Sequence, residues 1–295
     1  MEIGIIQAVQ SIHTEGFWGA LLDALMLAIT FLGESLFLVL VLFVVYWCID
    51  KKTGDFLVFC VYLSAGLNFT LKNIFTRPRP CFSDACREGA IRHVKVDNIL
   101  VDTDFKPTSY SFPSGHAGIA SGLYFGMATY FKRRWITVAS VIVSLLIALS
   151  RIYLGVHYPT DVLAGLLCGV LCSVLVGALY LKFYRYKYLF YGVVTFLFLI
   201  GALITGNTNM YALFGVGAGY TVGSIIEEKY VSFDLKSIWW KRILRFFVGL
   251  GSTGLVFLPF YLLCGINGAW AALTLFPTIV AAVSLAPFLF KILKL

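Results

Sequence analysis

Two histidines in short polar motifs are the residues of this chain best suited to chemistry. His116 closes the segment 113–116, Pro-Ser-Gly-His, and His157 is followed four residues later by Asp161. Pro159 suits the first turn of a helix, so the Asp161 carboxylate can reach back to one imidazole nitrogen of His157. That hydrogen bond would fix the tautomer and leave the opposite nitrogen as a nucleophile. We therefore expect His157 to attack and Asp161 to orient it.

Basic residues close to these motifs favour a multiply charged anion as the ligand. Lys72, Arg79 and Arg151 would place positive charge beside lipid, where unpaired charge is costly. Arginine binds phosphate oxygens with a planar fork, and lysine adds a compact point charge. Ser114 and Gly115 precede a predicted helix, so their backbone N–H groups can point at the same anion. We therefore expect these five residues to bind a phosphoryl group.

His116 is then available for the proton transfers of phosphoryl transfer. As a general acid it would protonate the leaving alkoxide, and as a general base it would activate the water that cleaves a phosphohistidine. Carboxylates near the motifs are too few for a two-metal centre, and the three cations can neutralise the phosphoryl charge that a metal balances elsewhere. We expect no metal ion and no other cofactor.

The elements that position these motifs must be membrane-spanning helices. Hydrophobic residues make up 60% of the 295 residues, charged residues 13%, and the mean hydropathy is +0.88. A soluble domain of this size cannot bury so much apolar surface, which excludes an ordinary globular enzyme. An aromatic share of 16% excludes disorder. The net charge of +8 is dispersed between apolar runs, which excludes a nucleic-acid-binding face.

Apolar runs separated by charged residues predict nine spans, each of about 20 residues, and therefore an all-α, polytopic membrane helical bundle. Residues 1–33 precede these spans and are expected to form one or two interfacial or re-entrant helices. The predicted spans are residues 34–49, 55–75, 115–131, 136–151, 159–181, 188–204, 211–226, 243–264 and 269–290.

The distribution of lysine and arginine predicts the orientation in the membrane. One set of connections, together with the C-terminal tail, holds 15 of the 23 basic residues. The positive-inside rule places this set and the C-terminus in the cytoplasm, and the N-terminus outside. All the motifs then lie on the extracytoplasmic face of a plasma or inner membrane.

The long polar connection at 76–112 lies on the same face. A solvated loop is the default interpretation of its alternating charges, and a lid or a headgroup selector is the second. Cys81 and Cys86 in this loop would form a local disulfide only if the loop faces an oxidising compartment.

The three motifs together resemble the complete signature of the type-2 phosphatidic acid phosphatase superfamily, which also includes vanadium haloperoxidases. This resemblance implies that His157 is the nucleophile, Asp161 its partner and His116 the acid–base residue. The family's six-helix core would cover residues 34–187, leaving 188–295 as an extension with three extra transmembrane helices. The motifs are Lys72-x6-Arg79-Pro80, Pro113-Ser114-Gly115-His116 and Ser150-Arg151-x5-His157-x3-Asp161. The resemblance also assigns phosphate binding to Lys72, Arg79, Ser114, Gly115 and Arg151.

These observations predict an integral-membrane, metal-independent lipid phosphatase acting through a phosphohistidine. Its partners would be the membrane and a phosphorylated lipid, with phosphatidate, phosphatidylglycerophosphate, polyprenyl diphosphate and sphingoid-base phosphate all open as substrates. One alternative is a sugar-phosphate phosphatase, because glucose-6-phosphatases resemble this chain in motif order and in having nine spans. A second is a transporter or lipid-binding protein that has kept a phosphate site. The sequence gives no oligomeric state.

Overall fold

The computed structural model describes residues 1–96, 100, 101, 103, 105, 106 and 109–295. Within these residues the regular elements are all helices and no strand is present, which confirms the predicted all-α class. The chain divides into two compact units. The first consists of Met1–Leu40 and Leu63–Ala178, and the second of Val41–Tyr62 and Leu179–Leu295. The predicted division into residues 1–33, 34–187 and 188–295 stays a prediction.

Each of the nine predicted spans coincides with a helical segment, and the protein is a multi-span membrane protein. Within the described residues, six helices are long and apolar enough to cross a membrane. A seventh span arises if the helices at Phe17–Phe31 and Ser35–Ile49, bent by 50°, count as one. The helix at Gly115–Phe131 is only 17 residues long, and the helix at Thr208–Ile226 is rich in glycine, so neither is among the six.

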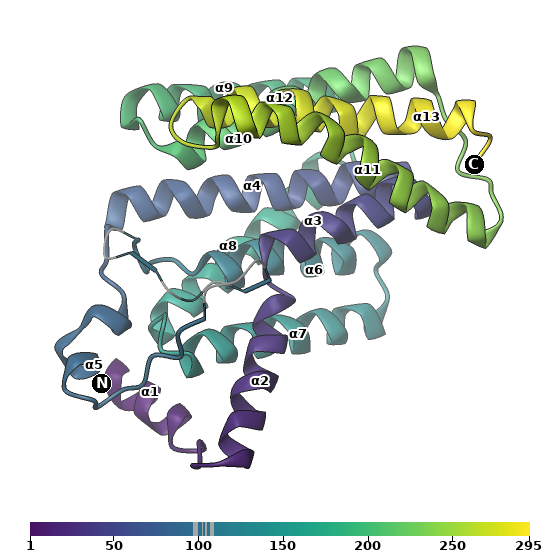
Figure 1. Ribbon diagram of the computed structural model, residues 1–295. Helices are drawn as coiled ribbons and strands as arrows, with labels where there is room; N and C mark the ends of the chain where they lie inside the picture. Colours follow the sequence, from purple (N-terminus) through teal and green to yellow (C-terminus); the bar gives the residue numbers. More distant parts are fainter. Residues whose placement is uncertain (97–99, 102, 104, 107–108) are drawn as a thin grey trace. The chain divides into compact units, whose positions relative to one another are not determined.

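The first unit holds the predicted motifs (Figure 1). Two of its helices, α3 and α4, also extend into the second unit, and α1 and α2 lie within residues 1–33. Its elements are α1 (Glu2–Gln10), α2 (Phe17–Phe31), α3 (Ser35–Val44), α4 (Lys51–Phe75), η2 (Pro80–Phe82), α5 (Asp84–Arg87), α6 (Gly115–Phe131), α7 (Arg134–Tyr153) and α8 (Pro159–Leu179).

Helices α6 and α8 approach closely because glycines line their contact. A Cβ atom added at Gly165 would lie 2.5 Å from the Ser114 carbonyl oxygen, and one at Gly169 would lie 2.3 Å from that of Gly118. Only glycine leaves room for such an approach. It brings the beginnings of the two helices together, and the Ser114 N–H donates to the Asp161 carbonyl oxygen at 2.9 Å.

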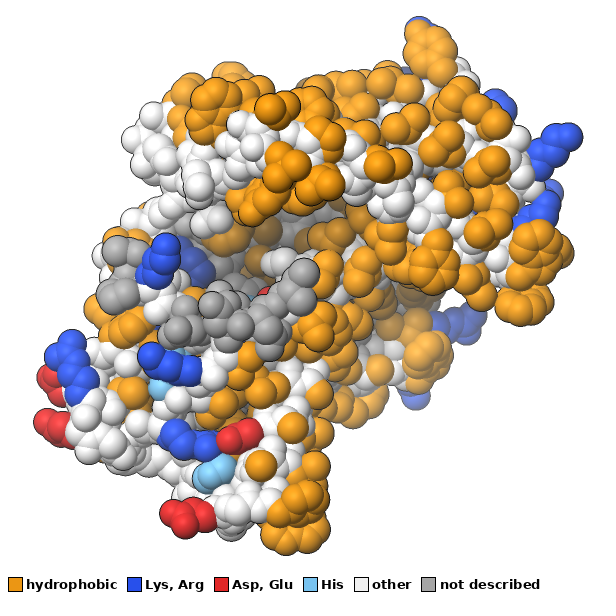
Figure 2. Space-filling view, viewed as in Figure 1, with side chains coloured by type: hydrophobic (Ala, Val, Ile, Leu, Met, Phe, Trp, Pro, Cys, Tyr) orange, Lys and Arg blue, Asp and Glu red, His pale blue; other side chains and the backbone are white. Residues whose placement is uncertain are grey.

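The second unit consists of the later helices and the first part of α4. On α9, exposed apolar side chains recur three or four residues apart, as at Leu189, Val193 and Phe196, which is typical of a face that contacts lipid. Figure 2 shows apolar side chains over these helices and basic ones gathered at one end. Its other elements are η1 (Val45–Ile49), η3 (Tyr184–Tyr186), α9 (Lys187–Thr205), α10 (Thr208–Ile226), η4 (Glu227–Val231), α11 (Trp239–Cys264), α12 (Trp270–Val280), η5 (Ala281–Leu285) and α13 (Ala286–Ile292).

Cys81 and Cys86 are both free thiols, so the structure does not contain the disulfide considered for them. In the loop that holds them, the charges considered at Asp97, Asp102 and Asp104 lie outside the described residues.

Candidate active site

The eight predicted site residues all belong to the first unit, and each lies at or beside the end of a helix. Helix ends suit polar chemistry in a membrane protein because they reach the polar boundary of the bilayer. Lys72 lies in the last turn of α4, Arg79 precedes η2, Ser114, Gly115 and His116 begin α6, Arg151 lies in the last turn of α7, His157 precedes α8 and Asp161 lies in its first turn.

His157 lies at the centre of this group and is only 1% exposed. Burial lowers its pKa well below the usual value, and the positive charges of Arg79, Lys72 and Arg151 lower it further, with His116 adding to the effect. All four side chains therefore lie close enough to His157 to disfavour its protonation, and the imidazole is neutral at neutral pH.

The hydrogen bonds of His157 define its tautomer. Arg79 Nη1 donates to His157 Nε2 at 3.0 Å. A guanidinium group is never an acceptor, so Nε2 carries the lone pair and Nδ1 carries the proton. Nδ1 lies 3.3 Å from the Ser111 hydroxyl and 3.5 Å from Asp161 Oδ2. The nitrogen that carries the lone pair, Nε2, therefore faces Arg79, one of the cations expected to bind the phosphoryl group.

The Asp161 carboxylate is fully buried and is fixed by three donors. Its Oδ2 accepts from the Ser111 hydroxyl and, at 2.8 Å, from the Tyr158 N–H, while Oδ1 accepts from Arg77 Nη1 at 2.9 Å. Because Ser111 touches both the carboxylate and the imidazole, its hydroxyl bridges them. Sequence reasoning missed Ser111 and Arg77, whose only signal is that each lies two residues before a motif residue.

This bridge predicts a loss of activity in Ser111→Ala. Without the hydroxyl, His157 Nδ1–H loses its nearest acceptor, and we expect kcat to fall roughly 10- to 100-fold with little change in KM. Steady-state kinetics of the purified variant measures both. Ser83→Ala is the matched control, because the Ser83 hydroxyl donates to the nearby Pro80 carbonyl oxygen and, among the described residues, contacts neither His157 nor Asp161. Equal rates in the Ser111 variant and the wild type would contradict the bridge.

The three cations of the site are held by neutral oxygens and by an aromatic ring. Lys72 Nζ donates to the Tyr110 and Ser111 carbonyl oxygens at 3.0 and 3.3 Å. Arg151, fully buried, donates to Thr30 Oγ1 at 2.9 Å. These contacts to neutral groups orient the cations, and oriented cations suit the binding of an anion.

Arg79 has the most extensive contacts of the three. Its Nε and Nη2 donate to Ser109, each at 3.1 Å, and the guanidinium lies 3.6 Å from the centroid of the Phe105 ring. Nη1 also donates to the Val156 carbonyl oxygen at 3.1 Å. The planar fork is thus fixed on one side while Nη1 faces the nucleophile.

His116 has a carboxylate partner of its own. Its Nε2 lies 2.7 Å from Oε1 of Glu34, which comes from the connection between α2 and α3. Glu34 is not among the predicted site residues, and the structure places its carboxylate beside the second histidine. The Glu34 carboxylate accepts from His116 Nε2–H and would stabilise the imidazolium that forms when His116 takes up a proton.

The beginning of α6 differs in one respect from the expectation. Both backbone N–H groups of Ser114 and Gly115 were expected to face the anion, but that of Ser114 is used by Asp161. The Ser114 side chain caps α6 by accepting from the Ala117 N–H at 3.4 Å. Ser114 therefore joins the two histidine motifs in addition to any contact with phosphate.

In the described part of the chain, no group of three or more His, Cys, Asp or Glu side chains is arranged to hold a metal ion.

Comparison with known proteins places the chain in a family. Residues 56–185 match the PAP2 superfamily, and residues 211–295 match "PAP2 superfamily phosphatase, transmembrane extension". The chain is 29% identical over 257 residues to a probable sphingosine-1-phosphate phosphatase of Dictyostelium discoideum, covering 77% of this chain and 57% of that protein. It is 29% identical over 157 residues to phosphatidylglycerophosphatase B of Bacillus subtilis, covering 49% and 68% of the two chains.

A solved structure is also similar, that of the first transmembrane PAP2-type phosphatidylglycerolphosphate phosphatase from Bacillus subtilis. It has a TM-score of 0.48 and 26% identity, covering 62% of this chain and 85% of that one. All eight predicted site residues fall within residues 56–185, and the two family matches extend over most of the chain. The chain therefore belongs to the PAP2 superfamily and carries its phosphatase transmembrane extension.

Proposed function

We propose that this protein is a metal-independent lipid phosphatase that cleaves a phosphomonoester or diphosphate through a phosphohistidine intermediate. The observation that carries the proposal is the state of His157, buried, neutral and with the lone pair of Nε2 turned to Arg79. A neutral imidazole with one nitrogen oriented by a hydroxyl and a carboxylate is a nucleophile prepared for attack.

The residues of the site divide the reaction into two steps. When the substrate binds, Arg79 Nη1 donates to a phosphoryl oxygen instead of to His157 Nε2. Lys72 and Arg151 balance the remaining negative charge of the phosphoryl group. Nε2 then attacks phosphorus, the bond to the leaving oxygen breaks, and His116 supplies the proton to that oxygen. In the second step His116 takes a proton from water, the water oxygen attacks phosphorus, and the P–N bond breaks. Inorganic phosphate leaves, and both histidines return to their starting states.

A lipid is the substrate class that the setting favours. A substrate anchored in the bilayer presents its phosphate at the depth of the helix ends, where the motifs lie. The relatives named above include two enzymes of phosphorylated lipids. Because the match covers only 57% of the first of these proteins, the substrate of the present chain is part of the proposal. By the positive-inside rule the site faces the extracytoplasmic side and the C-terminus the cytoplasm.

A substrate panel tests the proposal. In EDTA, we expect purified protein to release phosphate from at least one of phosphatidate, phosphatidylglycerophosphate, polyprenyl diphosphate and sphingoid-base phosphate in micelles. The value of kcat/KM for that lipid should exceed that for glucose 6-phosphate by about 100-fold, because acyl-chain binding contributes to the transition state. Vanadate should inhibit. Preference for the sugar would replace the lipid proposal, and loss of activity on chelation would overturn the metal-independent mechanism.

A further inference from the structure

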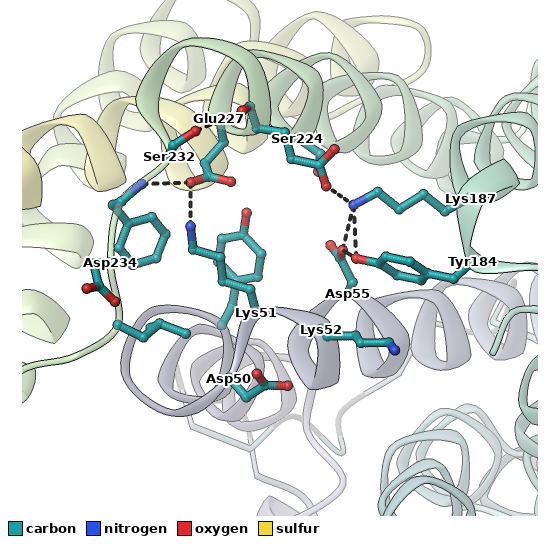
Figure 3. A pocket seen from close by; sticks show the side chains of 14 residues that line it. Asp50, Lys51, Lys52, Asp55, Tyr184, Lys187, Ser224, Glu227, Ser232 and Asp234 are labelled. Atoms are coloured by element: carbon teal, nitrogen blue, oxygen red, sulfur yellow. Dashed lines mark hydrogen bonds and ion pairs between the residues drawn. The ribbon is translucent and has the colours of Figure 1, made fainter.

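The second unit contains a polar cavity that the proposed reaction does not use. Its volume is about 590 Å³, within the range of small-molecule sites. Its walls come from the beginnings of α4 and α9, the end of α10, η4 and the segment that follows η4 (Figure 3).

The charges on the cavity wall exclude an anion as the ligand. Five carboxylates line it against three lysines, which gives an excess of two negative charges. Lys51 pairs with Glu227 at 2.7 Å, and Lys187 pairs with Asp55 at 2.8 Å and with Glu228. Two of the three lysines are thus paired with carboxylates, and the excess of negative charge favours a cation over an anion. The carboxylates are Asp50, Asp55, Glu227, Glu228 and Asp234, and the lysines are Lys51, Lys52 and Lys187.

A buried hydroxyl on the same wall is independent evidence for a ligand. Ser224 is 2% exposed, and its Oγ has no hydrogen-bond partner within the described chain. A buried hydroxyl without a partner is destabilising, so the ligand-free cavity leaves one polar group to be satisfied. Ser224 precedes Glu227 and Glu228 by three and four residues, so the three side chains share one helical face. Because α10 continues directly into η4, the negative pole of this helix lies at the end of η4, next to Ser232, which also lines the cavity.

Two lysine ammonium groups on the cavity wall have the same kind of surroundings, a carboxylate together with an aromatic ring. Lys51 Nζ lies 3.8 Å from the centroid of the Phe233 ring while it pairs with Glu227. Lys187 Nζ lies 4.9 Å from the ring of Tyr184 while it pairs with Asp55. A carboxylate together with an aromatic face is a combination that recognises ammonium. A further ammonium group would find the same surroundings.

We propose that this cavity binds a primary ammonium group, with Ser224 Oγ and the Glu227 and Glu228 carboxylates as acceptors. A primary ammonium has three donors to share among three acceptors, whereas a quaternary ammonium has none. Glu227 Oε1 is used by Lys51, and its other oxygen has no partner among the residues drawn in Figure 3. The ligand is a small amine such as ethanolamine, either free or as the headgroup of a lipid.

Thermal unfolding of the full-length protein in detergent tests the site with ethanolamine as the probe. Ethanolamine should raise the unfolding midpoint with increasing concentration, while tetramethylammonium and inorganic phosphate should not. Ser224→Ala should weaken the apparent Kd roughly tenfold, because it removes a hydrogen bond to a charged group. It should not lower the midpoint of the ligand-free protein, since the hydroxyl it removes has no partner there.

Thr253→Val is the matched control for this experiment. The Thr253 hydroxyl on α11 is also buried without a partner within the described chain, but it does not line the cavity. This variant should keep the ethanolamine response of the wild type. A wild-type response that Ser224→Ala leaves unchanged, or that Thr253→Val weakens equally, would overturn the site.

A second pair of samples distinguishes the two sources of the amine. Nanodiscs of phosphatidylethanolamine are compared with nanodiscs of phosphatidylcholine, with and without ethanolamine. If the ligand is a lipid headgroup, phosphatidylethanolamine raises the midpoint of the wild type but not of Ser224→Ala. If it is free, ethanolamine raises the wild-type midpoint equally in both membranes. No response to either form of the amine would overturn the proposal.

Discussion

His157→Ala is expected to abolish phosphate release, lowering kcat by at least about 10⁴-fold. In the proposed mechanism Nε2 of this residue forms the bond to phosphorus, and no other described side chain is placed to replace it. The Arg79 contact and the Ser111–Asp161 pair would remain without the group that they orient. The initial rate of phosphate release from the preferred lipid in detergent measures the effect.

The controls for this variant separate chemistry from folding. His157→Asn keeps a polar side chain opposite Arg79 and should be equally inactive while it unfolds near the wild-type temperature. His93→Ala removes an imidazole whose Nε2 contacts the Thr103 carbonyl oxygen at 2.8 Å, outside the motifs, and should retain activity. Activity of His157→Asn within tenfold of the wild type would rule out a phosphohistidine at this position.

The parts of the site that sequence could predict are those fixed by local geometry. Asp161 follows His157 by four positions, and Pro159 begins α8 between them, so local geometry brings the Asp161 carboxylate to 3.5 Å from Nδ1. The apolar runs located the helices for a similar reason, because the length of a span is set by the thickness of a bilayer.

The parts that sequence could not predict depend on contacts between distant segments. Glu34 lies 82 residues before His116, and nothing near either residue indicates that they pair. Ser111 lies in an irregular loop, where no periodicity predicts the direction of a side chain. The cavity of the second unit has the same origin, because the walls near Asp55, Lys187 and Glu227 come from three separate connections. The sequence treated these only as basic connections that indicate topology.

Arg79 illustrates how such distant contacts turn a motif residue into part of a mechanism. The sequence predicts that Arg79 binds phosphate oxygens through its planar fork, and nothing more. The structure shows a further requirement, because the guanidinium makes three contacts at once. Its N–H groups donate to Ser109 and His157, and its plane lies against the Phe105 ring. A planar, rigid group meets that demand, and a flexible ammonium does not.

Arg79→Lys is therefore expected to lower kcat by about 10²- to 10³-fold despite the conserved charge, because a preorganised donor to the transition state is lost. Lysine cannot bond to Ser109 and reach the phosphoryl oxygens together, so KM should rise less than kcat falls. Arg87→Lys, at an exposed arginine paired with Asp84, is the matched control and should keep wild-type kinetics. If Arg79→Lys retained full kcat, charge alone would suffice, and the fixed fork beside His157 would have no part in catalysis.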